Sequence, residues 1–247
     1  MRKELIEKTG YVVSISPYKE SDAMVTAFGE GGLFSFLARG LRKMTSKHNA
    51  ACQILCESRF SLYQSSDGKY LTLSESEALR PVALKDDLSL YGAVSFLAEA
   101  TKRFAEEGEG AGAEHYSVFR AMMDAIHDGY PICSACLLYF ASILNNLGYG
   151  LQVDGCVHCG KKEGIVGISF EEGGFLCEQC ADELTERPGA RELKILRYAF
   201  RFKKEDFARV AFEDKESIAL LSRLAAYAEQ ATGVRLKSLV LLERSVA

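Results

Sequence analysis

The chain has 247 residues and a formal net charge of −4, with 48% hydrophobic and 26% charged residues. This composition excludes a disordered chain, because it supplies enough apolar side chains for a sizeable core. No uninterrupted apolar run approaches the roughly 18 residues of a membrane helix, and the N-terminus leads into no signal-peptide core. We therefore expect a cytoplasmic globular protein of one or two domains.

Short strands are predicted between Gly10 and Leu79. Apolar and serine residues alternate over 11–16 and again over 34–36, which is the period of half-buried strands. Turn sequences at 29–32 and 65–68 separate the strands, and the second predicts a hairpin between 60–63 and 70–73. Residues 1–80 are thus predicted to form a small barrel. An OB-fold, which commonly binds oligonucleotides, fits this pattern, as do an SH3-like barrel and a plain sheet.

Residues 81–247 have the hydrophobic period of helices. Apolar residues share one helical face in each of five segments: 90–104, 116–126, 133–147, 193–202 and 218–228. Gly148 follows the third segment, where a glycine is expected to end the helix. The predicted fold class is therefore multidomain α+β, with an N-terminal OB-fold β-barrel followed by an all-helical domain.

The charges are unevenly distributed along these segments. Residues 1–80 have a balance of +2, residues 81–186 of −11 and residues 187–247 of +5. Net acidity argues against a nucleic-acid partner, because phosphate binding depends on Lys and Arg displacing counterions. The basic ends around an acidic middle nevertheless fit separate partner surfaces, with solvated helix faces as the alternative.

Four of the eight cysteines have the spacing of a metal site. Cys156-Val-His-Cys159 and Cys177-Glu-Gln-Cys180 enclose 17 residues, which is typical of two knuckles that hold one zinc ion with four thiolates. The sequence between them predicts a hairpin, with a strand at 165–170, a turn at 171–174 and a return at 175–176. We predict a structural zinc ribbon inserted at 153–183. Reduced buried thiols or a redox pair are the alternatives.

A catalytic zinc is not expected. Four cysteines fill a tetrahedral site and leave no position for water, so His158 is expected on the surface. Residues 131–136, Pro-Ile-Cys-Ser-Ala-Cys, resemble half of the nucleobase-deaminase signature, but no histidine of this chain is followed two residues later by an acid. The remaining thiols are interpreted as buried and structural, namely Cys52, Cys56, Cys133 and Cys136. No catalytic residue is predicted.

A basic segment follows the predicted strand at 34–36. It reads Arg39-Gly-Leu-Arg42-Lys43-Met-Thr-Ser-Lys47, and the chain has no acidic residue between Glu30 and Glu57. Cations beside aromatic rings on a barrel suit sequence-tolerant strand binding, in which the cations follow phosphates and the rings stack on bases. The alternative is a solvated basic loop over core phenylalanines. The candidate DNA contacts are Arg39, Arg42, Lys43, Lys47, Phe34 and Phe36.

The order of these motifs resembles the RecO family. The resemblance rests on Tyr18-Lys-Glu-Ser-Asp22, on Arg39-Gly-Leu-Arg42-Lys43-x-x-Ser46, on the helical middle and on the two C-x-x-C knuckles before a basic C-terminal helical region. It covers essentially the whole chain. Because all four knuckle cysteines are present, the resemblance implies the zinc-bearing branch of the family.

The resemblance implies a DNA repair and recombination mediator without enzymatic activity. Such a protein binds single- and double-stranded DNA, anneals complementary strands, and works with RecR to load RecA onto DNA coated with single-strand-binding protein. The resemblance also implies a nucleoid-associated location and contact with the acidic tail of that coating protein. The candidate basic surface for this tail, or for DNA, consists of Arg191, Arg197, Arg201, Lys203 and Lys204.

Two other functions remain open from the residues alone. One is a scaffold whose barrel and ribbon bind only proteins. The other is a zinc-dependent nucleic-acid enzyme, which requires an open coordination position on the metal.

Overall fold

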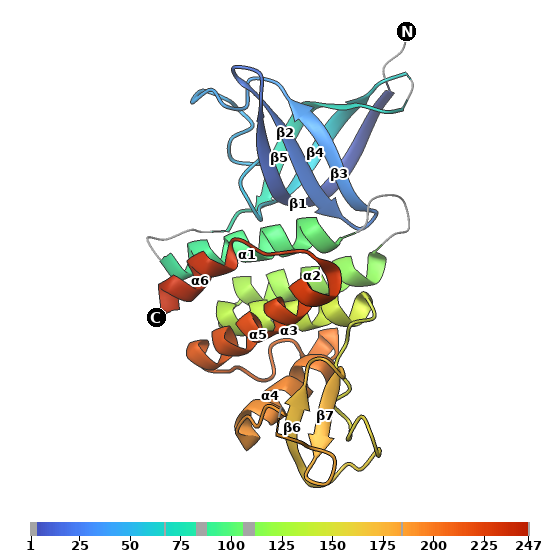
Figure 1. The fold of residues 1–247 in the computed structure, drawn as a ribbon. Helices are drawn as coiled ribbons and strands as arrows, with labels where there is room; N and C mark the ends of the chain where they lie inside the picture. Colours follow the sequence, from blue (N-terminus) through green and yellow to red (C-terminus); the bar gives the residue numbers. More distant parts are fainter. Residues whose placement is uncertain (1–3, 67, 83–87, 106–111, 184, 247) are drawn as a thin grey trace. The chain divides into compact units, whose positions relative to one another are not determined.

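The computed structural model describes residues 4–66, 68–82, 88–105, 112–183 and 185–246. It consists of two compact units, residues 1–117 and 118–247. Strands dominate the first unit and helices the second, so the predicted α+β class is confirmed (Figure 1).

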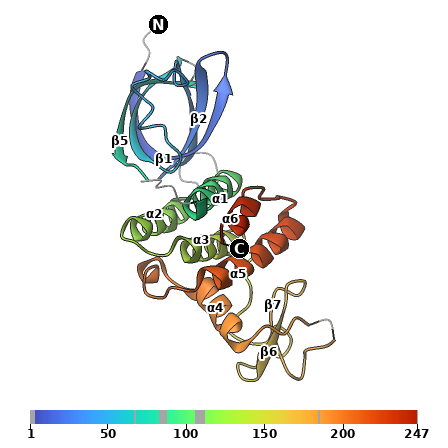
Figure 2. The same cartoon turned by 90° about the vertical axis from the view of Figure 1, so that its left-hand side faces the viewer.

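Five strands of the first unit form a closed barrel in the order β1-β2-β3-β5-β4 (Figure 2). β1 pairs with β2 on one side and with β4 on the other, and it bends at a bulge between Val12 and Ser14. The predicted hairpin is β4–β5, whose strands are antiparallel. The bounds are β1 (Glu4–Tyr18), β2 (Asp22–Gly29), β3 (Gly32–Ala38), β4 (Glu57–Gln64) and β5 (Leu71–Arg80).

Alternating side chains of the strands fill the barrel. Val12, Val25, Phe36, Phe60 and Leu62 have no exposed surface and belong to one apolar cluster. The rings of Phe36 and Phe60 lie 4.8 Å apart between their centroids. These two rings contribute strongly to the barrel core, because aromatic side chains bury the largest areas.

β1 and β2 approach each other closely at Gly10. A Cβ atom at this position would lie 2.7 Å from the Phe28 carbonyl oxygen, which belongs to the backbone and cannot rotate away. Gly29 is similarly close to the Thr9 carbonyl, at 2.6 Å. Only glycine therefore fits at this crossing of the barrel.

Replacement of Gly10 by alanine is predicted to destabilise the protein by about 1–3 kcal/mol, the usual cost of overpacking a well-filled site. Urea unfolding followed by circular dichroism measures this change. Gly31→Ala is the matched control, because a Cβ at Gly31 meets no atom within 4 Å. Equal stability of the two variants would contradict the packing argument.

The first unit also includes α1 (Leu88–Phe104) and the first residues of α2 (Ala113–His127). α1 packs against β1. Tyr116 of α2 packs edge-on against Phe28 of the barrel, with ring centroids 5.4 Å apart. The barrel strands themselves end at Arg80.

The second unit is built around α3 (Ile132–Asn146), whose residues from Cys133 to Leu144 are all buried. α3 packs against α4 (Ala190–Arg201) and α5 (Asp214–Thr232). Gly148 adopts a φ of 81° just after this helix, and the Tyr149 N–H donates to the Leu144 carbonyl, so the predicted glycine cap is confirmed. The unit also contains β6 (Ile165–Ser169), β7 (Gly174–Cys177), η1 (Lys204–Asp206) and α6 (Leu239–Val246).

Candidate metal centre and nucleic-acid interface

The β6–β7 hairpin brings the two cysteine knuckles together. Its strands pair in antiparallel fashion from Ile165 and Cys177 at one end to Ser169 and Gly174 at the other, as the sequence predicted. Each knuckle is a tight turn: the Gly160 N–H donates to the Cys156 carbonyl, and the Cys180 N–H donates to the Cys177 carbonyl. The ligand atoms of Cys156, Cys159, Cys177 and Cys180 consequently lie within 4.8 Å of one another.

The geometry of the four thiols fits a tetrahedral metal ion. The Sγ atoms of Cys159 and Cys177 are 3.6 Å apart. Four sulfurs at the Zn–S distance of about 2.3 Å would be separated by about 3.8 Å. The four cysteines could therefore hold a metal ion. They would fill all four positions of a tetrahedral site.

Backbone N–H groups of the knuckles favour thiolates at two of the cysteines. Burial raises the pKa of Cys156, but hydrogen bonds led by the Cys159 N–H outweigh it and lower this pKa to about 6. The pKa of Cys177 is also lowered against the effect of burial, first by a hydrogen bond from the Cys159 thiol and then by the Gln179 and Cys180 N–H groups. Hydrogen bonds with the other thiols, first that of Cys159, raise the pKa of Cys180 to about 12. A bound metal ion would displace such shared protons.

The ribbon is fastened to the helices of the second unit. Phe170, just after β6, packs on Tyr227 of α5 with a centroid distance of 5.6 Å. The Arg223 guanidinium lies 5.3 Å from the centroid of the Phe170 ring and forms an ion pair with Glu186. His158 lies on the surface, as expected, and its Nε2 is 2.8 Å from a carboxylate oxygen of Glu172 in the hairpin turn.

The remaining cysteines are buried, as the sequence predicted. Cys133 and Cys136 belong to the buried helix α3, and burial raises the pKa of Cys136 well above its usual value. Cys52 belongs to the apolar cluster inside the barrel, and burial raises its pKa to about 12. Buried thiols of this kind behave as small apolar side chains.

The basic segment is an ordered loop between β3 and β4, and we call residues 39–50 the basic loop. Leu41 belongs to the barrel's apolar cluster, so the loop is fixed near its start. Its turns are closed by backbone hydrogen bonds, such as Lys43 N–H to Gly40 carbonyl and Ser46 N–H to Lys43 carbonyl. The Asn49 side-chain amide donates to the Lys43 and Met44 carbonyls, both at 3.3 Å. Arg39, Lys43 and Lys47 are exposed.

Arg42 holds the basic loop against the β1–β2 turn. Its Nη1 atom donates to the carbonyl oxygens of Lys19 and Glu20, at 3.4 and 3.1 Å. The Asp22 carboxylate accepts a hydrogen bond of 2.8 Å from the Gly40 N–H. Arg42 was predicted only as a phosphate contact, and the structure adds an anchoring role for it. The two sequence motifs that support the family resemblance thus lie side by side.

Lys19 is a cation of this edge that sequence analysis missed. It sits in the β1–β2 turn with a φ of 53° and is far from the basic loop in sequence. The contacts of Arg42 bring it beside that loop. The sequence signal that could have identified Lys19 is its position inside the Tyr18–Asp22 motif of the family resemblance. His48 adds no charge at neutral pH, because burial and the neighbouring Lys47 lower its pKa.

The expected base-stacking role of Phe36 is corrected. Phe36 has no exposed surface and lies in the barrel core, so its ring offers no face to a base. Phe34 is half-buried, packs against the same cluster, and has Lys8 Nζ at 5.4 Å from its ring centroid. The two rings lie on the inward side of β3, and Ser35 between them is exposed. This agrees with the alternative interpretation, a solvated basic loop over core phenylalanines.

The basic residues of α4 are largely matched by carboxylates. Arg191 contacts Glu213 and Glu216, with an Nε–Oε1 distance of 2.5 Å to the latter. Arg197 and Arg201 both approach Asp154, at 3.7 and 3.3 Å. Lys203 and Lys204 follow the helix and are exposed. This surface is therefore less electropositive than the sequence alone indicated.

Comparison with known families assigns the chain. The family model "Recombination protein O N terminal" matches residues 1–82, and "Recombination protein O C terminal" matches residues 85–239. The chain belongs to the RecO family.

Curated RecO relatives match nearly the whole chain. "DNA repair protein RecO" of Oceanobacillus iheyensis is 26% identical over 97% of this chain and 94% of its own length. The protein of the same name from Bacillus cytotoxicus is 28% identical over 95% of each chain. This RecO-family chain therefore groups with DNA repair proteins.

One solved structure aligns with part of the RecO-family chain. The asparaginyl-tRNA synthetase of Entamoeba histolytica aligns with 53% of this chain and 34% of its own, at 9% identity and a TM-score of 0.29. That similarity is too low to support an argument. In the ranges that the structure describes, the RecO-family chain has no helix with the length and hydropathy needed to cross a membrane.

The four-cysteine cluster of this RecO-family chain is predicted to bind one zinc ion per chain through sulfur alone. X-ray absorption of the purified protein is expected to show four sulfurs at about 2.3 Å. Cys159→Ser should lose the zinc and unfold the ribbon, because thiolate coordination replaces an apolar core there. Cys133→Ala should keep the zinc. A nitrogen ligand from His158, or full zinc occupancy in Cys159→Ser, would contradict the assignment.

Proposed function

We propose that this chain is a non-enzymatic recombination mediator that binds single- and double-stranded DNA and anneals complementary strands. The observation that carries the proposal is the basic loop, whose exposed Arg39, Lys43 and Lys47 are presented on an ordered, hydrogen-bonded scaffold. Cations held in place before binding lose little conformational freedom when they meet phosphates. Net acidity of the whole chain does not oppose this contact, because the field at the loop is set by charges within about 10 Å.

The barrel topology supports the OB-fold interpretation. A closed five-stranded barrel in the order β1-β2-β3-β5-β4, with β1 paired to both β2 and β4, is the arrangement we assign to an OB-fold. Barrels of this type commonly bind oligonucleotides. The basic loop and the β1–β2 turn form the edge that we propose for the DNA backbone.

Annealing needs no covalent step. Two complementary strands repel each other through their phosphates, and a protein that supplies fixed cations lowers the free energy of bringing them together. We propose that the metal is zinc and is structural, since four thiolates leave no coordination position for a reacting water. The ribbon then keeps the second unit folded and takes no part in chemistry.

We further propose the protein partners of the RecO family for this chain. These are RecR, the acidic tail of single-strand-binding protein and, indirectly, RecA on the coated strand, which places the protein at the nucleoid. An acidic tail at α4 would exchange ion pairs with Arg197 and Arg201, which are exposed and now face Asp154. Exposed ion pairs contribute only about 0–1 kcal/mol each, so such an exchange is inexpensive.

Neutralising the exposed cations of the basic loop should weaken DNA binding. The triple variant Arg39→Gln, Lys43→Gln, Lys47→Gln is expected to reduce the salt slope for single strands by about 2, since each lost phosphate contact removes about 0.7. Arg42 stays in place so that the loop remains anchored. Fluorescence anisotropy of a labelled oligonucleotide across a salt series measures the slope.

The matched control removes three exposed cations of the second unit, with Lys194→Gln, Lys215→Gln and Arg235→Gln. This variant has the same net charge as the loop variant and should bind single strands like the wild type. Equal losses in the two variants would show that binding follows net charge and not the basic loop. No binding by the wild type in dilute buffer would favour the protein-only scaffold.

Strand annealing tests the activity and its partner together. The wild type should anneal complementary strands with and without single-strand-binding protein, and annealing should fade as salt rises, because the phosphate contacts weaken. Release of a cleaved or modified strand in this assay would instead indicate an enzyme. Retained DNA binding without annealing would restrict the function to DNA binding.

A further inference from the structure

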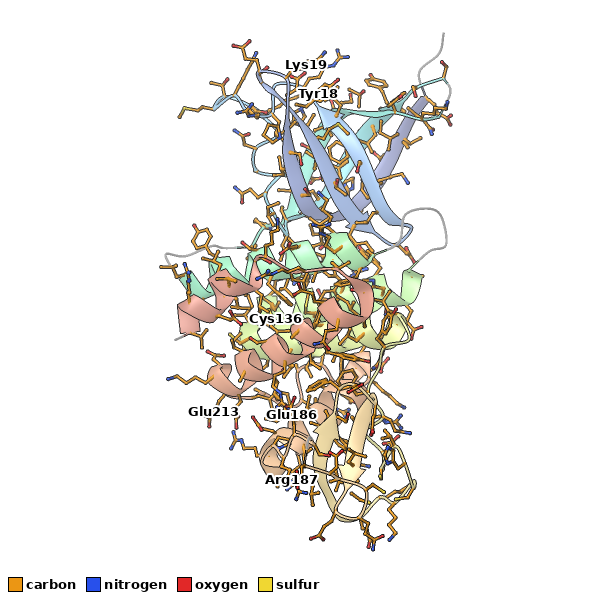
Figure 3. The ribbon with its side chains drawn as sticks, in the orientation of Figure 1. Tyr18, Lys19, Cys136, Glu186, Arg187 and Glu213 are labelled. Carbon is orange, nitrogen blue, oxygen red and sulfur yellow. The ribbon has the colours of Figure 1, made fainter. Side chains whose placement is uncertain are left out.

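Two exposed apolar side chains lie at the basic edge of the barrel. Met44 of the basic loop has 98% of its surface exposed, and Tyr18 at the end of β1 has 43%. Figure 3 shows Tyr18 and Lys19 at the end of the barrel where β1 turns into β2. Single exposed apolar side chains are common, but apolar side chains beside cations are the arrangement that suits a ligand combining phosphates with apolar faces.

Hydrogen bonds hold the backbone that carries these two side chains. The two hydrogen bonds from Arg42 to the β1–β2 turn hold Tyr18 and Lys19 beside the basic loop. Lys19 Nζ lies 5.4 Å from the centroid of the Tyr18 ring, so a cation and an aromatic face are presented together. The Met44 carbonyl accepts a hydrogen bond from the Asn49 side chain, which orders the backbone that carries this methionine.

The other exposed aromatics of the barrel have a different setting. Tyr63 of β4 lies directly across from Leu5 of β1, and it is 40% exposed. Exposed carboxylates surround this part of β1, β4 and β5, and Arg59 there is paired with Glu77 at 2.9 Å. Carboxylates repel a phosphate backbone, so this outer face does not suit nucleic acid. The exposed acids are Glu4, Glu7, Glu75 and Glu77.

We propose that Tyr18 and Met44 are the base contacts of the DNA interface, with unstacked bases packing on the Tyr18 ring and against the Met44 side chain. This inference rests on the proposed DNA binding. It assigns the base contacts to surface residues in place of Phe34 and Phe36, which were predicted from the sequence. Base–aromatic stacking contributes about 1–3 kcal/mol per base, so Tyr18→Ala should weaken single-strand binding about 5- to 150-fold. The salt slope should stay unchanged, because no charge is lost.

Tyr18→Trp gives a direct test, because the chain contains no tryptophan. Its single tryptophan should be quenched when a thymidine oligonucleotide binds, and it should not be quenched by an abasic oligonucleotide of the same length. Tyr63→Trp is the matched control. Tyr63 is 40% exposed on the acidic outer face of the same barrel, and its emission should not change with either ligand.

Three outcomes separate the two proposals. If wild-type protein binds neither oligonucleotide, the proposed DNA binding is wrong. If the protein binds both with equal affinity and Tyr18→Trp shows no quenching, the DNA binding stands and the base contacts are wrong. If the thymidine strand binds more tightly and quenches only Tyr18→Trp, both stand.

The contribution of Met44 is tested separately by one apolar and one polar substitution. Met44→Leu should retain affinity for the thymidine oligonucleotide, whereas Met44→Ser should reduce it severalfold at an unchanged salt slope. Because Met44 is almost fully exposed, both variants should have the unfolding midpoint of the wild type. Equal affinities of the two variants would remove Met44 from the interface.

Discussion

The attachment of the basic loop to the barrel is the constraint on which the nucleic-acid interface depends. Leu41 and Cys52 enter the apolar core, while Arg42 crosses to the β1–β2 turn. Between these anchors His48 and Ala51 are buried, and the cationic side chains of Lys43 and Lys47 project into solvent. The same interactions that complete the core therefore fix where the cations are presented. The basic loop therefore contributes both to the stability of the barrel and to the positive charge at the β1–β2 turn.

The four-cysteine cluster of the ribbon is a second and independent constraint. The ribbon has a small apolar cluster of its own, built around Cys156, Leu176 and Cys177. A cluster of this size is too small to order a hairpin without additional bonds. Coordination of a metal ion by the four cysteines would supply that order, and the contacts of Phe170 and Arg223 connect the ribbon to α5. The cysteines thus act on the second unit, and the loop anchors act on the first.

Much of this fold was predictable from the sequence where the signal is local. The Cys-x-x-Cys spacing restricts ligand positions within each knuckle, so the cluster could be predicted before the structure. Strong apolar periodicity likewise identified α3 and α5. β2 was harder, because its inward residues include the small side chains Ala23 and Ala27. The short helix α6 offered too few turns for a periodic pattern.

Side-chain direction was less predictable than the elements. Phe34 and Phe36 alternate as a surface platform would, and a period of two does not distinguish the inside of a barrel from its outside. Arg42 looked like its neighbours in sequence, because its partners Lys19 and Glu20 lie on another strand connection. The carboxylates that match the α4 arginines were also distant in sequence. The roles of the phenylalanines, of Arg42 and of the α4 arginines all depend on tertiary partners, which composition does not reveal.

The position of Asp154 links the knuckles to the charge of a neighbouring helix. This residue precedes Cys156 by two positions, and its carboxylate faces both Arg197 and Arg201. Unfolding of the ribbon would take the carboxylate away and leave two uncompensated guanidinium groups on α4. Protein without metal would consequently carry more uncompensated positive charge on α4 than the metal-loaded protein, and would attract polyanions to this helix more strongly. Metal content therefore has to be known for every preparation whose affinity for nucleic acid is compared.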